Sequence, residues 1–289
     1  MIRHATLAQF LRSGDAARIS GPVAVILAED MVEIDTTLRH HLARGFRQIL
    51  LFAPAEAPDP EGCGGDVIRV DHAAPRDGDL PAIVSAVLPR LPADTWVYAG
   101  HNAEYLFYPF CETRRVSEML AFHAEERRRA MLAYVVDLYP ADLAAHPDGV
   151  CLDTAQFDRM GYFATERAGP DGAPKDRQLD FHGGLRWRFE EHVPADRRRI
   201  DRIALFRARP GLRMREDFTF DDEEMNTYAC PWHNSLTCAV VSFRAAKALM
   251  ANPASREAID RFTWPGSETF AWSSRQLMQA GLMEPGQWF

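Results

Sequence analysis

Apolar segments and helical repeats alternate along the first half of the chain. Apolar runs that are typical of buried strands occupy residues 22–28, 46–53, 66–70 and 95–99. Between them, residues 30–44 and 80–91 carry apolar side chains at the spacing of a helix that packs one face on a core. Strands joined by helical crossovers pair in parallel, and the helices cover both faces of the sheet. The pattern therefore predicts an α/β protein with a mostly parallel, Rossmann-like sheet flanked by helices.

The second half of the chain has a weaker pattern. A helix is expected at 115–130, strands at 131–138, 202–208 and 235–243, and helices at 244–251, 254–262 and 267–281. The polar segment 166–178, which contains several glycines and prolines, is typical of a mobile loop. Residues 181–192 indicate a turn between short strands. No repeat or linker divides the sequence, so we expect a single domain that ends in a helical elaboration.

Composition and charge disfavour several classes of protein. The 289 residues are 47% hydrophobic and 26% charged, which is ordinary for a globular protein. A net charge of −8 disfavours a general nucleic-acid binder, whose surface is usually basic. No apolar run approaches the ~20 residues that cross a bilayer, and the N-terminus lacks the apolar core of a signal peptide. We therefore expect a soluble cytoplasmic protein with no nucleic-acid partner and no transmembrane segment.

Polar side chains collect where the first and the fourth predicted strands end. These residues are Glu29, Asp30, His101, Asn102 and Glu104. Ligands of α/β proteins bind beyond the carboxyl ends of the strands, so we expect these side chains to border a ligand pocket. The nearby Tyr105, Phe107 and Tyr108 could form an aromatic wall for a sugar ring. The alternative is that His101 and Asn102 only cap the following segment.

Two further groups of residues carry candidate chemistry. Asp137 comes at the end of a predicted strand, where a carboxylate could take a proton from a hydroxyl group. A turn or cap is the alternative role for this aspartate. In the second group, His182 precedes Gly183 and Gly184, whose flexible backbone could approach a substrate, and Arg186 could offer charge to phosphate. An ordinary tight turn explains the glycines equally well.

Several segments match one family pattern in order along most of the chain. They are VAVILAEDMVEIDTTLRHHLARGFRQILLF (23–52), HNAEYLFYP (101–109), DLYP (137–140), GGLR (183–186), WSSRQL (272–277) and GLM (281–283). Together they resemble the compact subgroup of the family-2-type glycosyltransferases of the GT-A fold. In that family the second segment is an acidic Asp-x-Asp-Glu motif after a strand, and it is often followed by Tyr-Pro.

The resemblance implies a fold and an activity. It implies a single GT-A-like domain over residues 1–289, with a nucleotide-binding half at 1–140 and an acceptor half with C-terminal helices at 141–289. The implied reaction transfers a sugar from a nucleotide-sugar donor to a surface glycan or glycoconjugate acceptor. Asp137 is then a candidate for the catalytic base. The implied nucleotide- and sugar-binding residues are Glu29, Asp30, His101, Asn102, Glu104, His182, Gly183, Gly184 and Arg186.

The sequence departs from the family where the nucleotide and the metal bind. His101 and Ala103 stand at the two aspartate positions, so Glu104 is the only acid that remains in the motif. Mn²⁺ and Mg²⁺ prefer oxygen ligands, so we expect metal binding through His101 and Glu104 to be weak or absent. Imidazole would also suit Zn²⁺, and arginine could supply the positive charge without any metal.

Two other functions remain open at this stage. The first is a catalytically inactive GT-A-like protein that binds a nucleotide, a glycan or a partner enzyme. The second, a flavodoxin-like or Rossmann binder, is disfavoured because no G-x-G-x-x-G follows the first strand. Acidic Glu29 and Asp30 would also repel a phosphate at that place.

Overall fold

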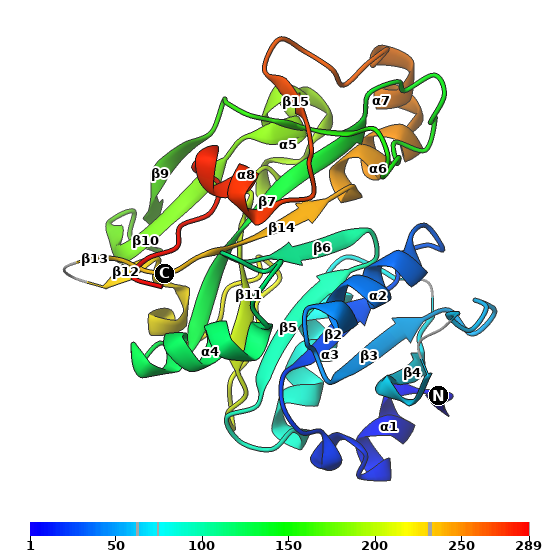
Figure 1. The fold of residues 1–289 in the computed structure, drawn as a ribbon, viewed down its shortest axis with the longest axis vertical. Coiled ribbons are helices and arrows are strands. Elements are labelled where there is room, and N and C mark those ends of the chain that lie inside the picture. Colours follow the sequence, from blue (N-terminus) through cyan, green and yellow to red (C-terminus); the bar gives the residue numbers. More distant parts are fainter. Residues whose placement is uncertain (62–63, 74, 231–232, 289) are drawn as a thin grey trace.

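The computed structural model describes residues 1–61, 64–73, 75–230 and 233–288 (Figure 1). The strands of its main sheet are β1 (Ile2–His4), β2 (Val23–Leu27), β3 (Gln48–Ala53), β4 (Val67–Asp71), β5 (Trp96–His101), β6 (Glu104–Phe107), β7 (Ala130–Pro140), β8 (Ala155–Asp158), β11 (Asp201–Arg207), β14 (Cys238–Ser242) and β15 (Ser267–Thr269). Two hairpins lie outside this sheet, β9 (Phe163–Ala168) with β10 (Pro174–His182) and β12 (Ala229–Cys230) with β13 (His233–Asn234). The helices are α1 (Leu7–Ser13), α2 (Ile34–Ala43), α3 (Asp79–Val87), α4 (Val116–Glu125), α5 (Gly184–Arg188), α6 (Arg244–Ala251), α7 (Pro253–Ala258) and α8 (Ser274–Gln279).

The first half of the chain forms a parallel sheet with helices on both faces. The strand order of the main sheet is β1-β4-β3-β2-β5-β11-β7-β14-β6, and β8 and β15 join it through β7. In the part of this order that runs β1-β4-β3-β2-β5, every strand is parallel to its neighbours. Leu38 of α2 packs in one core cluster and Ile83 of α3 in another. The predicted α/β class, with a mixed and largely parallel sheet flanked by helices, is confirmed.

The sheet bends back on itself after β5. Beyond β5, strands β11 and β6 run antiparallel to their neighbours, whereas β14 is parallel to β7. β6 nevertheless follows β5 after only Asn102 and Ala103. The backbone N–H of His101 also donates to the Glu104 carboxylate at 2.9 Å. The start of β6 therefore lies against the end of β5, although three strands separate them in the sheet order.

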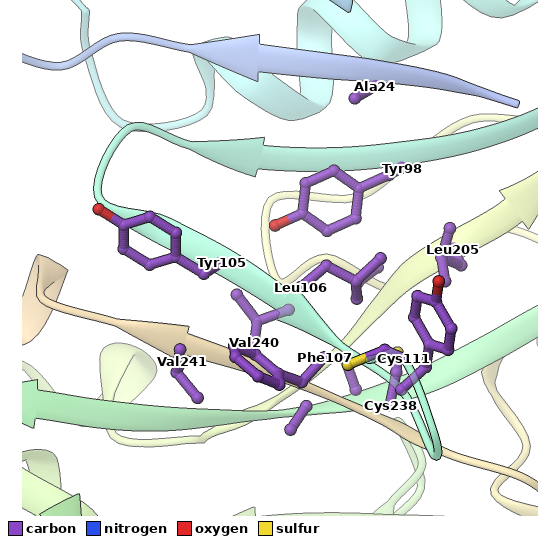
Figure 2. Packing of buried hydrophobic residues seen from close by; sticks show 14 of the residues in the cluster. Ala24, Tyr98, Tyr105, Leu106, Phe107, Cys111, Leu205, Cys238, Val240 and Val241 are labelled. Atoms are coloured by element: carbon purple, nitrogen blue, oxygen red, sulfur yellow. The ribbon is translucent and has the colours of Figure 1, made fainter. Parts of the chain in front are cut away.

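The interior of this bend is a packed apolar core. Figure 2 shows Tyr98 of β5, Leu106 of β6 and Val240 of β14 close together in it. Tyr105, Phe107 and Tyr108 belong to the same cluster, and each is at most 2% exposed. The prediction that these three rings form a sugar-binding wall is therefore wrong, because their apolar faces are buried when β6 joins the sheet.

Strand β5 is longer than the sequence predicts. Gly100 and His101 continue it because both residues pair with β2. Gly100 leaves room for a neighbouring ring, since a Cβ at this position would lie 2.5 Å from the hydroxyl oxygen of Tyr98. The chain turns only after His101, where Ala103 has a left-handed φ of 56°. Gly100 therefore belongs to the strand, although the apolar run alone predicts that the strand ends at residue 99.

Three other segments also differ from their predictions. Residues 166–178 lie largely in the β9–β10 hairpin rather than in a loop, and Arg167 anchors them by pairing with Asp180 at 2.7 Å. Residues 181–192 include helix α5, where strands were expected on both sides of a turn. The helix predicted at 267–281 is wrong in its first half, because β15 pairs there with β8. No described helix has the length and the apolar character that a membrane crossing needs.

Candidate functional site

A pocket of about 600 Å³ lies beyond the carboxyl end of β2, where Glu29 and Asp30 line it together with residues of β11 and α6. The parallel order β4-β3-β2-β5 changes direction between β2 and β5, because β3 and β4 follow β2 on one side and β5 lies on the other. Ligands of open α/β sheets bind at such a reversal. Charged side chains of both signs line this pocket, among them Glu29, Asp30, Arg186, Arg199, Arg202, Arg244 and Lys247.

Glu29 follows β2 and forms a two-pronged ion pair with Arg244 at the start of α6. Its carboxylate oxygens lie 2.7 Å from Nε and 2.6 Å from Nη2 of Arg244. Burial alone would raise the pKa of Glu29, but His101, Arg244 and Lys247 act against burial, and the pKa falls to about 2. Glu29 is therefore an anion at neutral pH, and the pair holds α6 against the end of β2.

Acid is expected to remove the contribution of Glu29 to stability. Because its folded-state pKa of about 2 lies below the ordinary value of 4.5, the contribution is complete above pH 4.5 and is lost as the pH falls to about 2. The linked free energy is roughly 3 kcal/mol. Urea unfolding between pH 7 and pH 2 measures this loss. The Glu29→Gln variant should lose less stability over that range, and an equal loss would contradict the assignment.

Asn102 fixes the turn that carries Glu29 and Asp30. Its side-chain oxygen accepts the backbone N–H of Glu29 at 2.8 Å, and its amide nitrogen donates to Asp30 Oδ1 at 2.6 Å and to the Val32 carbonyl at 2.8 Å. The second Asp30 oxygen lies 2.8 Å from Nζ of Lys247. Asn102 is fully buried, so it positions the acids that line the pocket instead of contacting a ligand itself.

His101 lies directly behind the pocket lining, where it is 3% exposed. Its Nε2 is 3.9 Å from Oε1 of Glu29, and its Nδ1 is 3.5 Å from Oε2 of Glu104. Burial lowers the pKa of His101, and nearby Arg244 lowers it further. The carboxylates of Glu29 and Glu104 act in the opposite direction but do not restore the ordinary pKa. The three side chains Glu29, His101 and Glu104 do converge, but only Glu29 reaches the pocket surface.

Glu104 is fully buried and paired with Arg202 of β11. Its oxygens lie 2.7 and 3.2 Å from the Arg202 guanidinium nitrogens, and one of them also accepts the Ser242 hydroxyl at 3.1 Å. Burial opposes ionisation, but Arg202 and His101 hold the pKa of Glu104 well below its ordinary value. The carboxylate thus links β6, β11 and β14 across the bend of the sheet.

No metal site stands out in the part of the chain that the structure describes. There, no three His, Cys, Asp or Glu side chains are grouped as a metal ion would require. A metal at His101 and Glu104 would have to replace Arg202 on a carboxylate that already accepts several hydrogen bonds. Weak or absent metal binding by these two residues stays a prediction.

Asp137 of β7 is buried beneath α5. Its Oδ1 lies 3.3 Å from Nε of Arg186, and its Oδ2 accepts the Arg186 backbone N–H at 3.4 Å. Burial raises the pKa of Asp137, and Arg186 offsets this effect only in part. Position 184, next to this carboxylate, favours glycine for two reasons. A Cβ there would lie only 2.8 Å from Asp137 Oδ2, and the backbone has a left-handed φ of 64°. Arg186 lines the pocket, whereas Asp137 does not reach it.

His182 and Gly183 lie outside the pocket lining. The His182 ring stacks on Phe163 with ring centroids 5.0 Å apart. A Cβ on Gly183 would lie 2.2 Å from Cδ1 of Tyr162, so this glycine lets the tyrosine ring pack on the backbone. Both residues connect β10 to α5 and belong to a neighbouring surface rather than to the pocket.

Sequence reasoning missed four side chains that define the pocket. Arg244 and Lys247 lie three residues apart on α6, and their shared helical face was the available signal. Arg202 was hidden in an apolar strand. Phe218 has a left-handed φ of 59°, and its ring lies over the Arg202 guanidinium at 5.6 Å. A bulky residue in this strained conformation needs surrounding contacts to hold it.

The turn around Phe218 is held by Asp217, the first residue of the acidic segment 217–224. Asp217 accepts hydrogen bonds from the backbone N–H of Thr219 at 3.1 Å and from its hydroxyl at 2.6 Å. Its other oxygen lies 3.2 Å from Nη1 of Arg199. Further along the run, Glu223 pairs with Lys175 and Arg215. Asp217 and Glu223 therefore have structural partners that explain their positions.

The fold and the site together define the class of protein. It is an α/β protein with a ligand pocket at the reversal of its parallel strands, lined by paired acids and bases. Comparison of the chain with protein-family models finds no match, and comparison with curated proteins finds none either.

Proposed function

We propose that this protein is a GT-A-like glycosyltransferase that transfers a sugar from a nucleotide-sugar donor to a surface glycan or glycoconjugate. The observation that carries the proposal is the position of the pocket, at the reversal between β2 and β5. The sequence segments that resemble the family-2-type glycosyltransferases border this same place. Glu29 and Asp30 come from the first of them, and Arg186 from the Gly-Gly-x-Arg segment.

The proposed chemistry uses arginine and lysine instead of a metal. A departing diphosphate needs positive charge near its oxygens, and Arg244 and Lys247 line the pocket next to each other on α6. In the structure each cation is paired with a carboxylate, Glu29 or Asp30. Phosphate oxygens would therefore bind by replacing these carboxylates, which weakens binding relative to a site with unpaired cations.

Asp137 is the proposed general base. Its raised pKa favours proton uptake, and it lies beneath the Arg186 backbone that borders the pocket. The side chain is buried, so an acceptor hydroxyl can reach it only if the Gly183–Gly184 backbone moves. Glycine makes such a movement easier, because it is compatible with more backbone conformations than other residues.

One observation favours a second function, a catalytically inactive GT-A-like protein that binds a nucleotide, a glycan or a partner enzyme. Glu104, the only acid left in the motif, is committed to Arg202, Ser242 and the His101 backbone. A residue held in this way stabilises the sheet and has no free oxygen for a donor. The pocket would then bind its ligand without chemistry.

Nucleoside diphosphates are expected to stabilise the protein equally with and without Mn²⁺. At ligand concentrations about tenfold above Kd, the melting temperature should rise by roughly 2–5 °C. Thermal shift with UDP, GDP and CDP, each with Mn²⁺ or with EDTA, measures this effect. Arg244→Met should abolish the rise, whereas Arg12→Met, which changes an exposed arginine on α1, should preserve it.

The other outcomes of this experiment separate the alternatives. A rise that needs Mn²⁺ would contradict the metal-independent chemistry proposed above. A nucleotide-induced rise without turnover of any sugar nucleotide would favour the inactive binding protein. No rise with any of the three nucleotides would refute a donor site in this pocket.

A further inference from the structure

We propose that the surface formed by Phe163, Trp187 and His182 is a binding platform for a neutral glycan chain. We call these three residues the aromatic platform. Phe163 is 45% exposed and Trp187 is 40% exposed. Among the described residues only six large hydrophobic side chains are exposed to this degree, and two of them meet here. Exposed apolar side chains that gather in one place mark interaction sites.

The rings of the platform pack on one another and on the backbone. Phe163 stacks on His182 with a centroid distance of 5.0 Å and an angle of 21°, and it meets the edge of Trp187 at 6.4 Å. Trp187 in turn lies over Gly161, where a Cβ would be 3.1 Å from its Cζ3 atom. Rings that are fixed before binding lose little conformational entropy when a ligand arrives.

The chemistry around the platform fits a sugar better than an apolar protein segment. Arg159 and Glu268 form an exposed ion pair at 3.7 Å, and Arg159 lies two residues before Gly161, over which Trp187 packs. This ion pair supplies hydrogen-bonding groups with no net charge, and one of its members is close in the chain to the backbone on which Trp187 packs. A sugar ring has the same combination, with apolar C–H faces and hydroxyl groups at its edge. Ligand sites commonly pair aromatic walls with a few polar groups in this way.

The platform and the candidate pocket share helix α5. Arg186 lines the pocket, and the next residue, Trp187, belongs to the platform. Because consecutive residues of α5 contribute to the pocket and to the platform, a glycan on the platform would bind close to the pocket, as an acceptor chain must. This role as an acceptor subsite rests on the proposed transferase function, but glycan binding itself does not.

Binding of defined oligosaccharides tests the platform. Cellohexaose, maltohexaose and the hexamer of N-acetylglucosamine are titrated into the full chain, and tryptophan fluorescence and calorimetry report binding. At least one hexasaccharide should bind, and Trp187→Ala and Phe163→Ala should each weaken it roughly tenfold or more. Ile2→Ala removes a side chain of similar exposure on β1 and should leave the affinity unchanged.

Three outcomes would overturn the platform. They are no binding of any of the three hexasaccharides, binding that survives both platform variants, and a dimer in sedimentation velocity that Trp187→Ala dissociates. The last result would identify the surface as a contact between copies of the chain. Glycan binding through the platform without any nucleotide binding would refute the proposed transferase function and leave the platform intact.

Discussion

Replacement of Glu104 by alanine is expected to destabilise the protein by about 3–5 kcal/mol. The variant removes the partner of Arg202, which is 4% exposed and lies inside the bend of the sheet. An unpaired charge that is almost completely removed from water costs far more free energy than the pair itself contributes. Urea unfolding at pH 7 measures the change, because Glu104 is ionised there and its pKa is far below the ordinary value.

A double variant separates the ion pair from the packing around it. Glu104→Leu with Arg202→Met removes both charges and keeps apolar volume, so it should be more stable than Glu104→Ala. The Glu104→Ala variant also tests the prediction that His101 and Glu104 bind a metal weakly or not at all. If Glu104→Ala left stability unchanged but abolished Mn²⁺ binding, Glu104 would be a metal ligand and its structural assignment would be wrong.

Replacement of Asp137 by asparagine is expected to slow sugar transfer roughly 10²–10⁴-fold, the usual contribution of a general base. Asparagine keeps the shape of the side chain beneath α5 but cannot accept a proton from a hydroxyl group. Because burial raises the pKa of Asp137, the rate of the natural protein should increase with pH through a midpoint above 3.8. The variant should lack this rising limb.

The rate and the fold must be measured together for this prediction. Asparagine leaves Arg186 without its carboxylate partner, so some loss of stability is expected from the change alone. Asp153→Asn alters an exposed aspartate and provides the matched control. Unchanged transfer and an unchanged pH profile in Asp137→Asn would assign the base elsewhere and leave Asp137 as a support for α5.

The parallel half of the fold follows from the sequence because its signals are local. Apolar runs and helical repeats predict β2, α2, β3 and α3 within a few residues, since these elements depend mainly on neighbours in the chain. The β9–β10 hairpin was missed for the opposite reason. Its polar residues are stabilised by distant partners, such as Glu224, whose carboxylate lies 2.8 Å from Nη2 of Arg177.

The sequence by itself determined the class of fold and the strand ends where Glu29 and Asp30 lie. Only the tertiary structure decided which residues face them. Glu29 and Arg244 are 215 positions apart in the chain, and no periodic pattern connects positions so distant. The tertiary structure also decided which candidates reach the pocket. Glu29 and Asp30 after β2 line it, whereas His101, Asn102 and Glu104 near the end of β5 are buried. Burial of a side chain depends on how the whole sheet bends, and that bend is set by packing between segments far apart in the sequence.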